Sequence, residues 1–252
     1  MILSFLTASG APGATTCILG LALQWPRPIL LLEASVGSPV LAGYCRGEIP
    51  HDRGLLGLLA GQRDNTLAVA LELSAIRLPG INAHLVPGFT SHQQVQRGTK
   101  ALWSDLIPLL QSVSAAGTDV MIDAGRYGQS AFPEPLLAAS DHVLHVLRND
   151  LPSVAAAART VPAVQACLRD APGSRVGAVV VGGQPPYAPA GVVDVLDVPL
   201  VAAVPFSPDH AETIRAGKQP PRGFERSALL VALAELGRNL NLYESPAQVS
   251  HV

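Results

Sequence analysis

Residues 7–23, TASGAPGATTCILGLAL, place two glycines and two adjacent threonines directly after an apolar run. A loop that binds phosphate through successive backbone N–H groups needs glycines, because side chains would obstruct the curl of the loop and the ligand. Gly10 and Gly13 supply such positions, and Thr15 and Thr16 then open a helix. The N-terminus of a helix attracts anions, and a threonine hydroxyl at this point can bind Mg²⁺. The stretch therefore has the outline of a phosphate-binding loop.

The loop departs from the common pattern G-x-x-x-x-G-K-[ST] at two of its defining positions. The aligned residues are Ala8, Ser9, Gly10, Ala11, Pro12, Gly13, Ala14 and Thr15. Ala8 stands in place of the first glycine, and Ala14 in place of the lysine. Taken alone, the stretch is therefore equally compatible with a tight strand-to-helix turn that binds nothing.

The elements that would position this loop alternate along the chain. Short apolar runs predict strands over residues 2–6, 29–33, 83–87, 120–123, 142–147, 176–181 and 201–204. Longer patterns between them predict helices over residues 15–23, 54–60, 92–115, 153–169, 190–196, 208–216 and 225–240. Strands that are apolar on both faces indicate a mostly parallel sheet covered by helices. We expect a doubly wound α/β fold in one domain, residues 1–242, followed by a flexible tail, residues 243–252.

Composition narrows the classes of partner. The 252 residues are 48% hydrophobic and 14% charged, with a formal net charge of -2 and only two lysines, Lys100 and Lys218. This composition disfavours strong binding to bulk nucleic acid. The three cysteines show no metal-ligand spacing, which favours small core residues in a reducing compartment. No signal-peptide pattern is present, and the polar C-terminal end does not favour a direct membrane anchor, so we expect a cytoplasmic protein.

Five segments in order resemble the MinD/ParA family of P-loop ATPases. They are Ser9–Thr16 for the loop, Ile29–Ser35 for the second strand, Asp119–Gly125 for the Walker B strand and its glycine turn, Ser140–Val146, and Val198–Pro205. The resemblance covers about residues 1 to 240. It implies ATP or ADP with Mg²⁺ as cofactor, a nucleotide loop formed by Gly10 to Thr16, and a metal site at Thr15 and Asp123.

The resemblance also shows what the site lacks. The family carries one loop lysine that contacts its own nucleotide and a signature lysine that reaches the nucleotide of the dimer partner; here these positions are Ala14 and Ser9. Losing two charged hydrogen bonds costs roughly 3–6 kcal/mol, or roughly 10² to 10⁴ in affinity. One of the two lysines, brought close by the fold, or Arg126 is a candidate substitute cation, although the position of Arg126 after the Walker B strand favours a surface or interface role.

Two further positions, at the end of the second predicted strand, differ from the acidic residues of the family. Glu33 keeps the first acid of the family's D-x-D in a longer form, and Ser35 replaces the second acid, which helps to position the attacking water. Asp123 keeps the Walker B carboxylate, and Gly125 the turn that follows it. The asparagine that reads adenine in the family is absent after Val181.

We therefore expect a degenerate site that binds nucleotide poorly or not at all and does not hydrolyse it usefully. Such a pseudo-ATPase would act as a positioning or assembly factor through protein partners. Divergent members of the family accompany secretion and pilus machines, and others place the cell-division site. A homodimer is implied as well, formed without the signature lysine. The alternatives are an active ATP-dependent dimer switch, a DNA-partitioning protein, and an unrelated α/β binding module.

Overall fold

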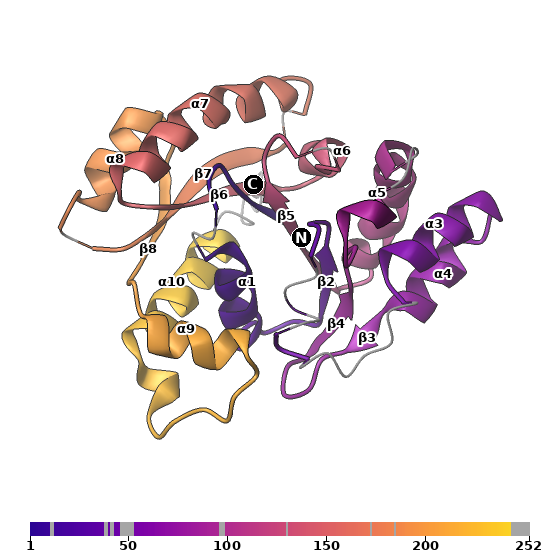
Figure 1. Cartoon of the computed structure of the whole chain (residues 1–252), viewed down its shortest axis with the longest axis horizontal. Helices are drawn as coiled ribbons and strands as arrows, with labels where there is room; N and C mark the ends of the chain where they lie inside the picture. Colours follow the sequence, from indigo (N-terminus) through magenta and orange to yellow (C-terminus); the bar gives the residue numbers. More distant parts are fainter. Residues whose placement is uncertain are drawn as a thin grey trace, which may run out of the picture.

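A computed structural model describes residues 1–10, 13–37, 40, 43–45, 53–95, 99–129, 131–171, 173–183 and 185–242 of the chain. Its centre is an eight-stranded sheet in the order β3-β4-β2-β5-β1-β6-β7-β8 (Figure 1). The strands are β1 Ile2–Thr7, β2 Ile29–Glu33, β3 Ile76–Arg77, β4 Ala83–Val86, β5 Asp119–Arg126, β6 His142–Arg148, β7 Arg175–Val181 and β8 Leu200–Val204. Neighbouring strands are parallel except for β3, which pairs antiparallel with β4 at one edge.

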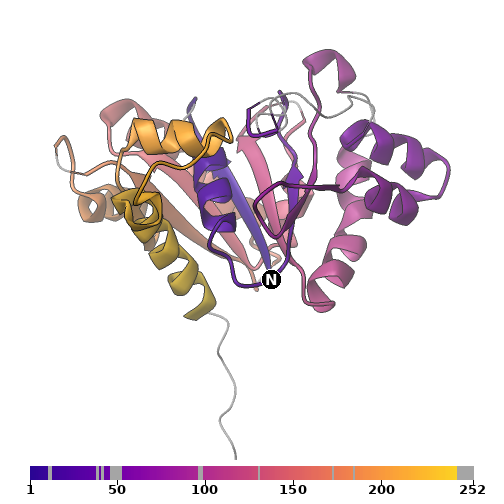
Figure 2. The same ribbon diagram turned by 90° about the horizontal axis from the view of Figure 1, so that it is seen from below.

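Helices cover both faces of this sheet, which confirms the predicted doubly wound α/β fold. They are α1 Ala14–Ala22, α3 Leu55–Arg63, α4 Leu67–Ser74, α5 Thr99–Ala115, α6 Glu134–Ala138, α7 Leu151–Cys167, α8 Pro189–Leu196, α9 Pro208–Arg215 and α10 Ala228–Leu242. One face carries α1, α9 and α10, and the other carries α3 to α8. Figure 2 shows α1 and α10 side by side on the first face.

The alternation of side chains along the strands explains why both faces are apolar. On β1, Leu3 and Phe5 enter the core beneath α1 and α10, whereas Ile2 and Leu6 enter the core beneath α3 to α6. The alternation holds through Leu6, although the pairing of β1 with β5 shifts register between Phe5 and Leu6. Because every strand of this kind is buried on two sides, its sequence is a continuous apolar run rather than an alternating one.

Three elements were not predicted from the sequence, and two helices begin later than expected. The two-residue strand β3 and the helices α4 and α6 were not predicted, because β3 and α6 are very short and α4 exposes Val69 and Leu73, so its apolar residues mark no single buried face. The helix expected over residues 92–115 is α5, which begins at Thr99, after a 3₁₀ turn at His92–Gln94; residues 96–98 lie outside the described part. The helix expected from residue 225 begins at Ala228, because a 3₁₀ turn occupies Phe224–Arg226.

The carboxyl ends of β1, β2 and β5 meet at one edge of the sheet. Asp123 on β5 pairs in register with Phe5 on β1 and with Glu33 on β2. Asp123 is two residues after Met121, so the two side chains point to the same face of the sheet. The Met121 side chain lies in the core beneath α1, and the Asp123 carboxylate therefore also faces α1. The sequence-predicted loop and the Walker B strand are thus brought together. In the described residues, no helix has both the length and the apolar character needed to cross a membrane.

Candidate functional site

The loop between β1 and α1 leaves the first turn of the helix open to a ligand. Gly13 is the N-cap of α1, with φ of 105°, a left-handed conformation that favours glycine, and no side chain caps the helix. The first hydrogen bond of the helix runs from the Cys17 N–H to the Gly13 carbonyl over 2.8 Å, so the N–H groups before Cys17 have no intrahelical acceptor. A Cβ added at Gly10 or Gly13 would meet no atom of the described residues within 4 Å. Ala11 and Pro12 lie outside the described residues.

Thr15 and Asp123 form the polar centre of the site. The Thr15 hydroxyl donates to the Asp123 carboxylate across 2.6 Å, and the Gly125 N–H donates to its other oxygen at 3.2 Å. Asp123 is 2% exposed, and this burial raises its pKa, against the opposing effect of the two hydrogen bonds. A hydroxyl beside a carboxylate supplies the hard oxygen ligands that Mg²⁺ takes in proteins. The pair therefore fits the metal position implied for Thr15 and Asp123.

Gly125 and Ser35 pack against each other beside this pair. Gly125 has φ of 73°, and a Cβ there would stand 2.7 Å from the Ser35 Cβ, so the close approach of β5 to the end of β2 requires glycine. Ser35 lines the same cavity as Thr15 and Asp123. It brings a hydroxyl, which cannot act as the carboxylate that the family resemblance implies at this position.

Glu33 serves the architecture of the neighbouring loops instead. It is fully buried, and its carboxylate accepts the Val40 N–H at 2.7 Å and the Gly88 N–H at 3.3 Å. A buried carboxylate of this kind holds the segment after β2 against the segment after β4. Among the described residues that line the cavity, Glu33 is absent.

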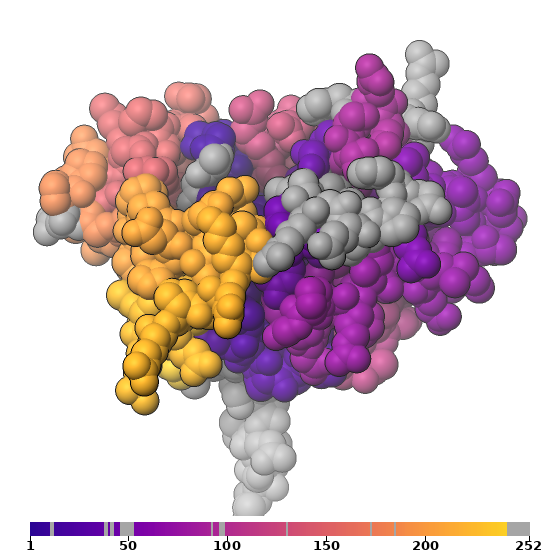
Figure 3. All heavy atoms as spheres, turned by 60° about the horizontal axis from the view of Figure 1, so that its bottom comes forward, coloured from indigo at the N-terminus to yellow at the C-terminus, as the bar shows by residue number. Residues whose placement is uncertain are grey.

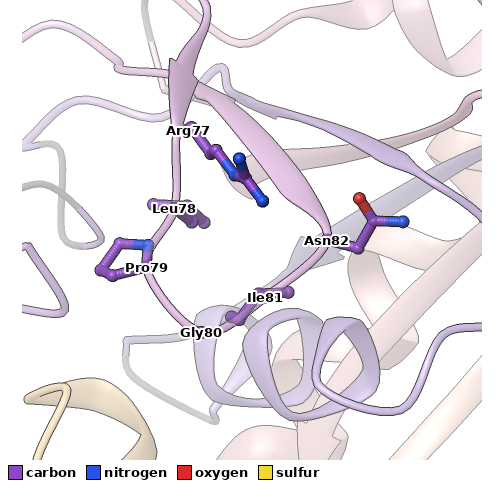
Figure 4. A pocket seen from close by; sticks show the side chains of 6 residues that line it. All are labelled: Arg77, Leu78, Pro79, Gly80, Ile81 and Asn82. Atoms are coloured by element: carbon purple, nitrogen blue, oxygen red, sulfur yellow. The ribbon is translucent and has the colours of Figure 1, made fainter.

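A cavity of about 540 Å³ lies elsewhere, at the turn between β3 and β4 (Figure 4). It is formed by Arg77, Leu78, Pro79, Gly80, Ile81 and Asn82. The turn precedes β4, so it lies at the edge where the parallel strands begin, opposite the phosphate loop. With one guanidinium and one amide as its polar side chains, this hollow offers no acid, base or nucleophile.

The cavity at the loop has a volume of about 480 Å³, within the range of small-molecule sites. Its lining comprises Thr7, Ser9, Gly10, Gly13 to Thr16, Ser35, Val36, Asp123, Gly125, Arg126, Gln129 and Arg215. All the described residues predicted for the site except Glu33 and the Val181 position meet here. Arg215, on α9, was missed by sequence reasoning, because 200 residues separate it from Thr15 and no motif surrounds it. The packing of α9 against α1 brings Arg215 to the cavity.

A smaller, mostly apolar hollow of about 160 Å³ adjoins the first and shares Gly13 and Thr16 with it. Val181, Val204 and Phe206 contribute its apolar side chains, and Arg148 its charge. The Arg148 guanidinium stacks 4.4 Å from the centroid of the Phe206 ring and pairs with Asp150 at 3.1 Å. These contacts already engage Arg148 within the protein.

An asparagine from another strand, Asn149, contacts the loop after β7, where the family's adenine-reading asparagine is absent. Asn149, just after β6, donates its amide hydrogens to the carbonyls of Gly183 and Tyr187, the latter at 2.8 Å. It crowds Gly182, where a Cβ would stand 2.1 Å from the Asn149 amide oxygen. Asn149 therefore organises the loop after β7.

Cys17 and the two lysines are placed away from the chemistry. Cys17 is 3% exposed, and burial raises the pKa of its thiol to about 12, which confirms the predicted core role. Cys45 is buried as well, whereas Cys167 at the end of α7 is exposed, so the predicted core role was wrong for Cys167. The Lys218 ammonium lies 3.4 Å from Glu212, and neither Lys218 nor Lys100 lines the 480 Å³ cavity.

Solved structures with the same fold are those of MinD/ParA ATPases. The Pyrococcus furiosus cell division ATPase MinD has a TM-score of 0.74 and 20% identity, with 96% of this chain and 98% of that chain covered. MinD in the Aquifex aeolicus MinC:MinD complex has a TM-score of 0.75 and 16% identity, covering 99% and 98%. A variant of Cyanothece McdA in complex with ATP has a TM-score of 0.74 and 16% identity, covering 99% and 98%. No family model and no curated protein matches the sequence.

The chain thus has the fold of the MinD/ParA P-loop ATPases over nearly its whole length, which confirms the fold that the sequence resemblance implied. Its own residues fit Mg²⁺ and phosphate groups in part. The uncapped helix, the open glycines and the Thr15–Asp123 pair fit, whereas the loop supplies no positive side chain at Ser9 and Ala14.

Proposed function

We propose that this protein is a MinD/ParA-like positioning or assembly factor that acts through protein–protein contacts and does not hydrolyse ATP at a useful rate. The observation that carries the proposal is the pair of uncharged residues Ser9 and Ala14, where the resembling family carries lysines. Both residues line the cavity. The other loop residues that the structure describes, within 8–10 and 13–16, carry no positive charge that could replace the two lysines.

The physical reason lies in the chemistry of phosphoryl transfer. Catalysis of this reaction rests almost wholly on positioned positive charge around the transferred group. Asp123 and Thr15 still fit a metal, and when bound, Mg²⁺ would supply charge there. The positions from which lysines would stabilise the same phosphates carry none, and Ser35 offers a hydroxyl where an acid would orient water. Weak nucleotide binding through backbone N–H groups is compatible with this arrangement, whereas rapid turnover is not.

The proposed cellular role rests on the resemblance to the MinD/ParA class of positioning proteins. Positioning in the cytoplasm of a secretion or pilus assembly machine, or of the cell-division site, fits a protein whose fold is shared with MinD and McdA. We propose residues 1–242 as one domain and residues 243–252 as a flexible tail. A homodimer would form through contacts that do not depend on nucleotide, since the residue that would reach the partner's phosphates is Ser9.

A second candidate is an active ATP-dependent dimer switch. The intact Thr15–Asp123 hydrogen bond of 2.6 Å and the open glycine positions favour it, because they are the parts of the site that would hold Mg²⁺ and phosphate. In this alternative Gly10, Gly13, Thr15 and Asp123 contact the nucleotide and its metal.

ATP turnover separates the two candidates. Purified protein is incubated with Mg-ATP, and phosphate release is compared with that of the variants Asp123→Asn and Ala14→Lys. We expect wild-type release at the level of the Asp123→Asn control, and an affinity for ATP that rises about tenfold or more in Ala14→Lys, since a charged hydrogen bond is worth about 1.5–3 kcal/mol. Wild-type turnover that Asp123→Asn abolishes would contradict the proposal. Light scattering with and without ATP gives a second readout, and a nucleotide-dependent dimer would favour the switch.

A further inference from the structure

Two arginines from outside the loop, Arg126 and Arg215, are among the residues that line the cavity at the loop. Arg126 is the last residue of β5, three positions after Asp123, and its neighbour Tyr127 donates its N–H to the Thr7 carbonyl at 2.8 Å. Arg215 is the last residue of α9, on the face of the sheet that also carries α1. The charged side chains among the described lining residues are Arg126, Arg215 and Asp123. Positive charge is thus restored at this cavity from elements that carry no part of the loop.

We propose that Arg126 and Arg215 provide the phosphate-binding charge that Ser9 and Ala14 lack, so that the cavity holds the polyphosphate of a nucleotide. This inference relies on the proposed function for the location of the site and adds the residues that would bind the ligand. The planar fork of a guanidinium matches two phosphate oxygens at once, which a lysine ammonium cannot do. The helix end at Gly13 and the hydroxyl of Thr16 would contact the same phosphates, while the Thr15 hydroxyl stays with Asp123 at the metal position.

The Arg215 guanidinium forms an ion pair with Glu212. Its Nε lies 3.0 Å and its Nη2 2.5 Å from Glu212 Oε2 on the same helix. Glu212 also accepts Lys218 at 3.4 Å, and the Arg215 side chain is about half exposed. Helix α9 and the segment that follows it form an exposed surface, drawn in orange in the space-filling view (Figure 3). An exposed ion pair of this kind contributes little free energy in water. A polyphosphate can therefore replace Glu212 as the partner of the Arg215 guanidinium.

The arrangement predicts opposite effects for two substitutions on one helix. Arg215→Ala removes a phosphate ligand and weakens binding, whereas Glu212→Gln frees the guanidinium and strengthens binding. A merely structural role for the Arg215–Glu212 pair would give both variants the same affinity for ligand. Arg159 on α7 is the matched control, because it is an exposed arginine on the opposite face of the sheet.

The test is calorimetric titration of the full chain with ATP, ADP and pyrophosphate, up to about 10 mM ligand, with melting temperature as a check on folding. We expect wild-type protein to bind, Arg126→Ala and Arg215→Ala each to weaken binding about tenfold or more, Glu212→Gln to strengthen it severalfold, and Arg159→Ala to leave it unchanged. Pyrophosphate that binds as well as ATP would assign the affinity to the phosphates alone.

Two results would overturn the inference. One is wild-type protein that takes up none of the three ligands, which leaves the proposed non-catalytic function intact. The other is binding that survives both arginine substitutions. Conversely, arginine-dependent binding accompanied by ATP turnover would support the assignment of Arg126 and Arg215 while refuting the proposed function. The two proposals therefore fail in separate experiments.

Discussion

His145 on β6 makes the stability of the fold sensitive to mild acid. The side chain is 1% exposed, its Nε2 shares a 2.9 Å hydrogen bond with the Thr160 hydroxyl of α7, and its Nδ1 has no hydrogen-bond partner among the described residues. Burial lowers the pKa of His145 from 6.5 to about 4. The folded protein therefore resists a proton that the unfolded chain accepts readily.

The sign and size of the effect follow from proton linkage. A base whose pKa is depressed in the folded state contributes almost nothing to the pH dependence above pH 6.5, and the folded state loses stability as the pH falls from there toward 4. The loss grows to about 2 kcal/mol at pH 5 and about 3 kcal/mol at pH 4. The variant His145→Gln, which keeps an amide near Thr160, removes the titrating group.

Urea unfolding between pH 7.5 and 4.5 measures this difference. The free energy of unfolding of wild-type protein should fall faster than that of His145→Gln over this range, by about 2.5 kcal/mol. His84→Gln is the control, because it makes the same replacement at an exposed histidine on β4. Parallel curves for wild type and His145→Gln would refute the reasoning that His145 is buried as a neutral base.

Three further predictions, two of them with a matched control substitution, test the site and the core. Asp123→Asn should raise the melting temperature at pH 7.5 by a few degrees in calorimetry, because burial disfavours the ionised carboxylate; a lower melting temperature would contradict this. Gly125→Ala should cost about 1–3 kcal/mol in denaturant unfolding, since its φ is 73° and its Cβ would meet Ser35, whereas Gly191→Ala, at an exposed position of α8 with open space around it, should gain about 0.5–1 kcal/mol; equal effects would refute the geometry. Leu233→Ala, fully buried on α10, should cost about 2–5 kcal/mol, whereas Val231→Ala, 52% exposed on the same helix, should change stability by under about 0.5 kcal/mol; similar losses would mean that α10 is packed differently.

The fold was predictable because burial on two faces is visible in the strands themselves. The runs Ile2–Leu6 and Ile29–Glu33 are apolar at every position but one, and such runs separated by helical patterns leave few alternatives to a parallel sheet. Helix α4 was missed for the opposite reason, since Val69 and Leu73 face solvent and blur the helical period. Two-residue strand β3 carries too few residues for any period.

That the loop, Thr15 and Asp123 meet in one cavity was predictable, because these residues lie close together in sequence or at strand ends that must converge. The role of Glu33 was not, because its carboxylate turns toward the N–H groups of Val40 and Gly88, a choice that depends on two distant loops. Arg215 was also beyond reach, because only tertiary packing brings the end of α9 to the cavity.

The most direct test of the central claim is calorimetric titration of the purified protein with ATP and ADP, with and without Mg²⁺. A degenerate site without loop lysines predicts a dissociation constant weaker than about 100 μM, roughly 5.5 kcal/mol of binding free energy. An unchanged melting temperature at about 100 μM nucleotide would agree with this. Binding of Mg-ATP tighter than about 100 μM would contradict the account of a weak nucleotide site.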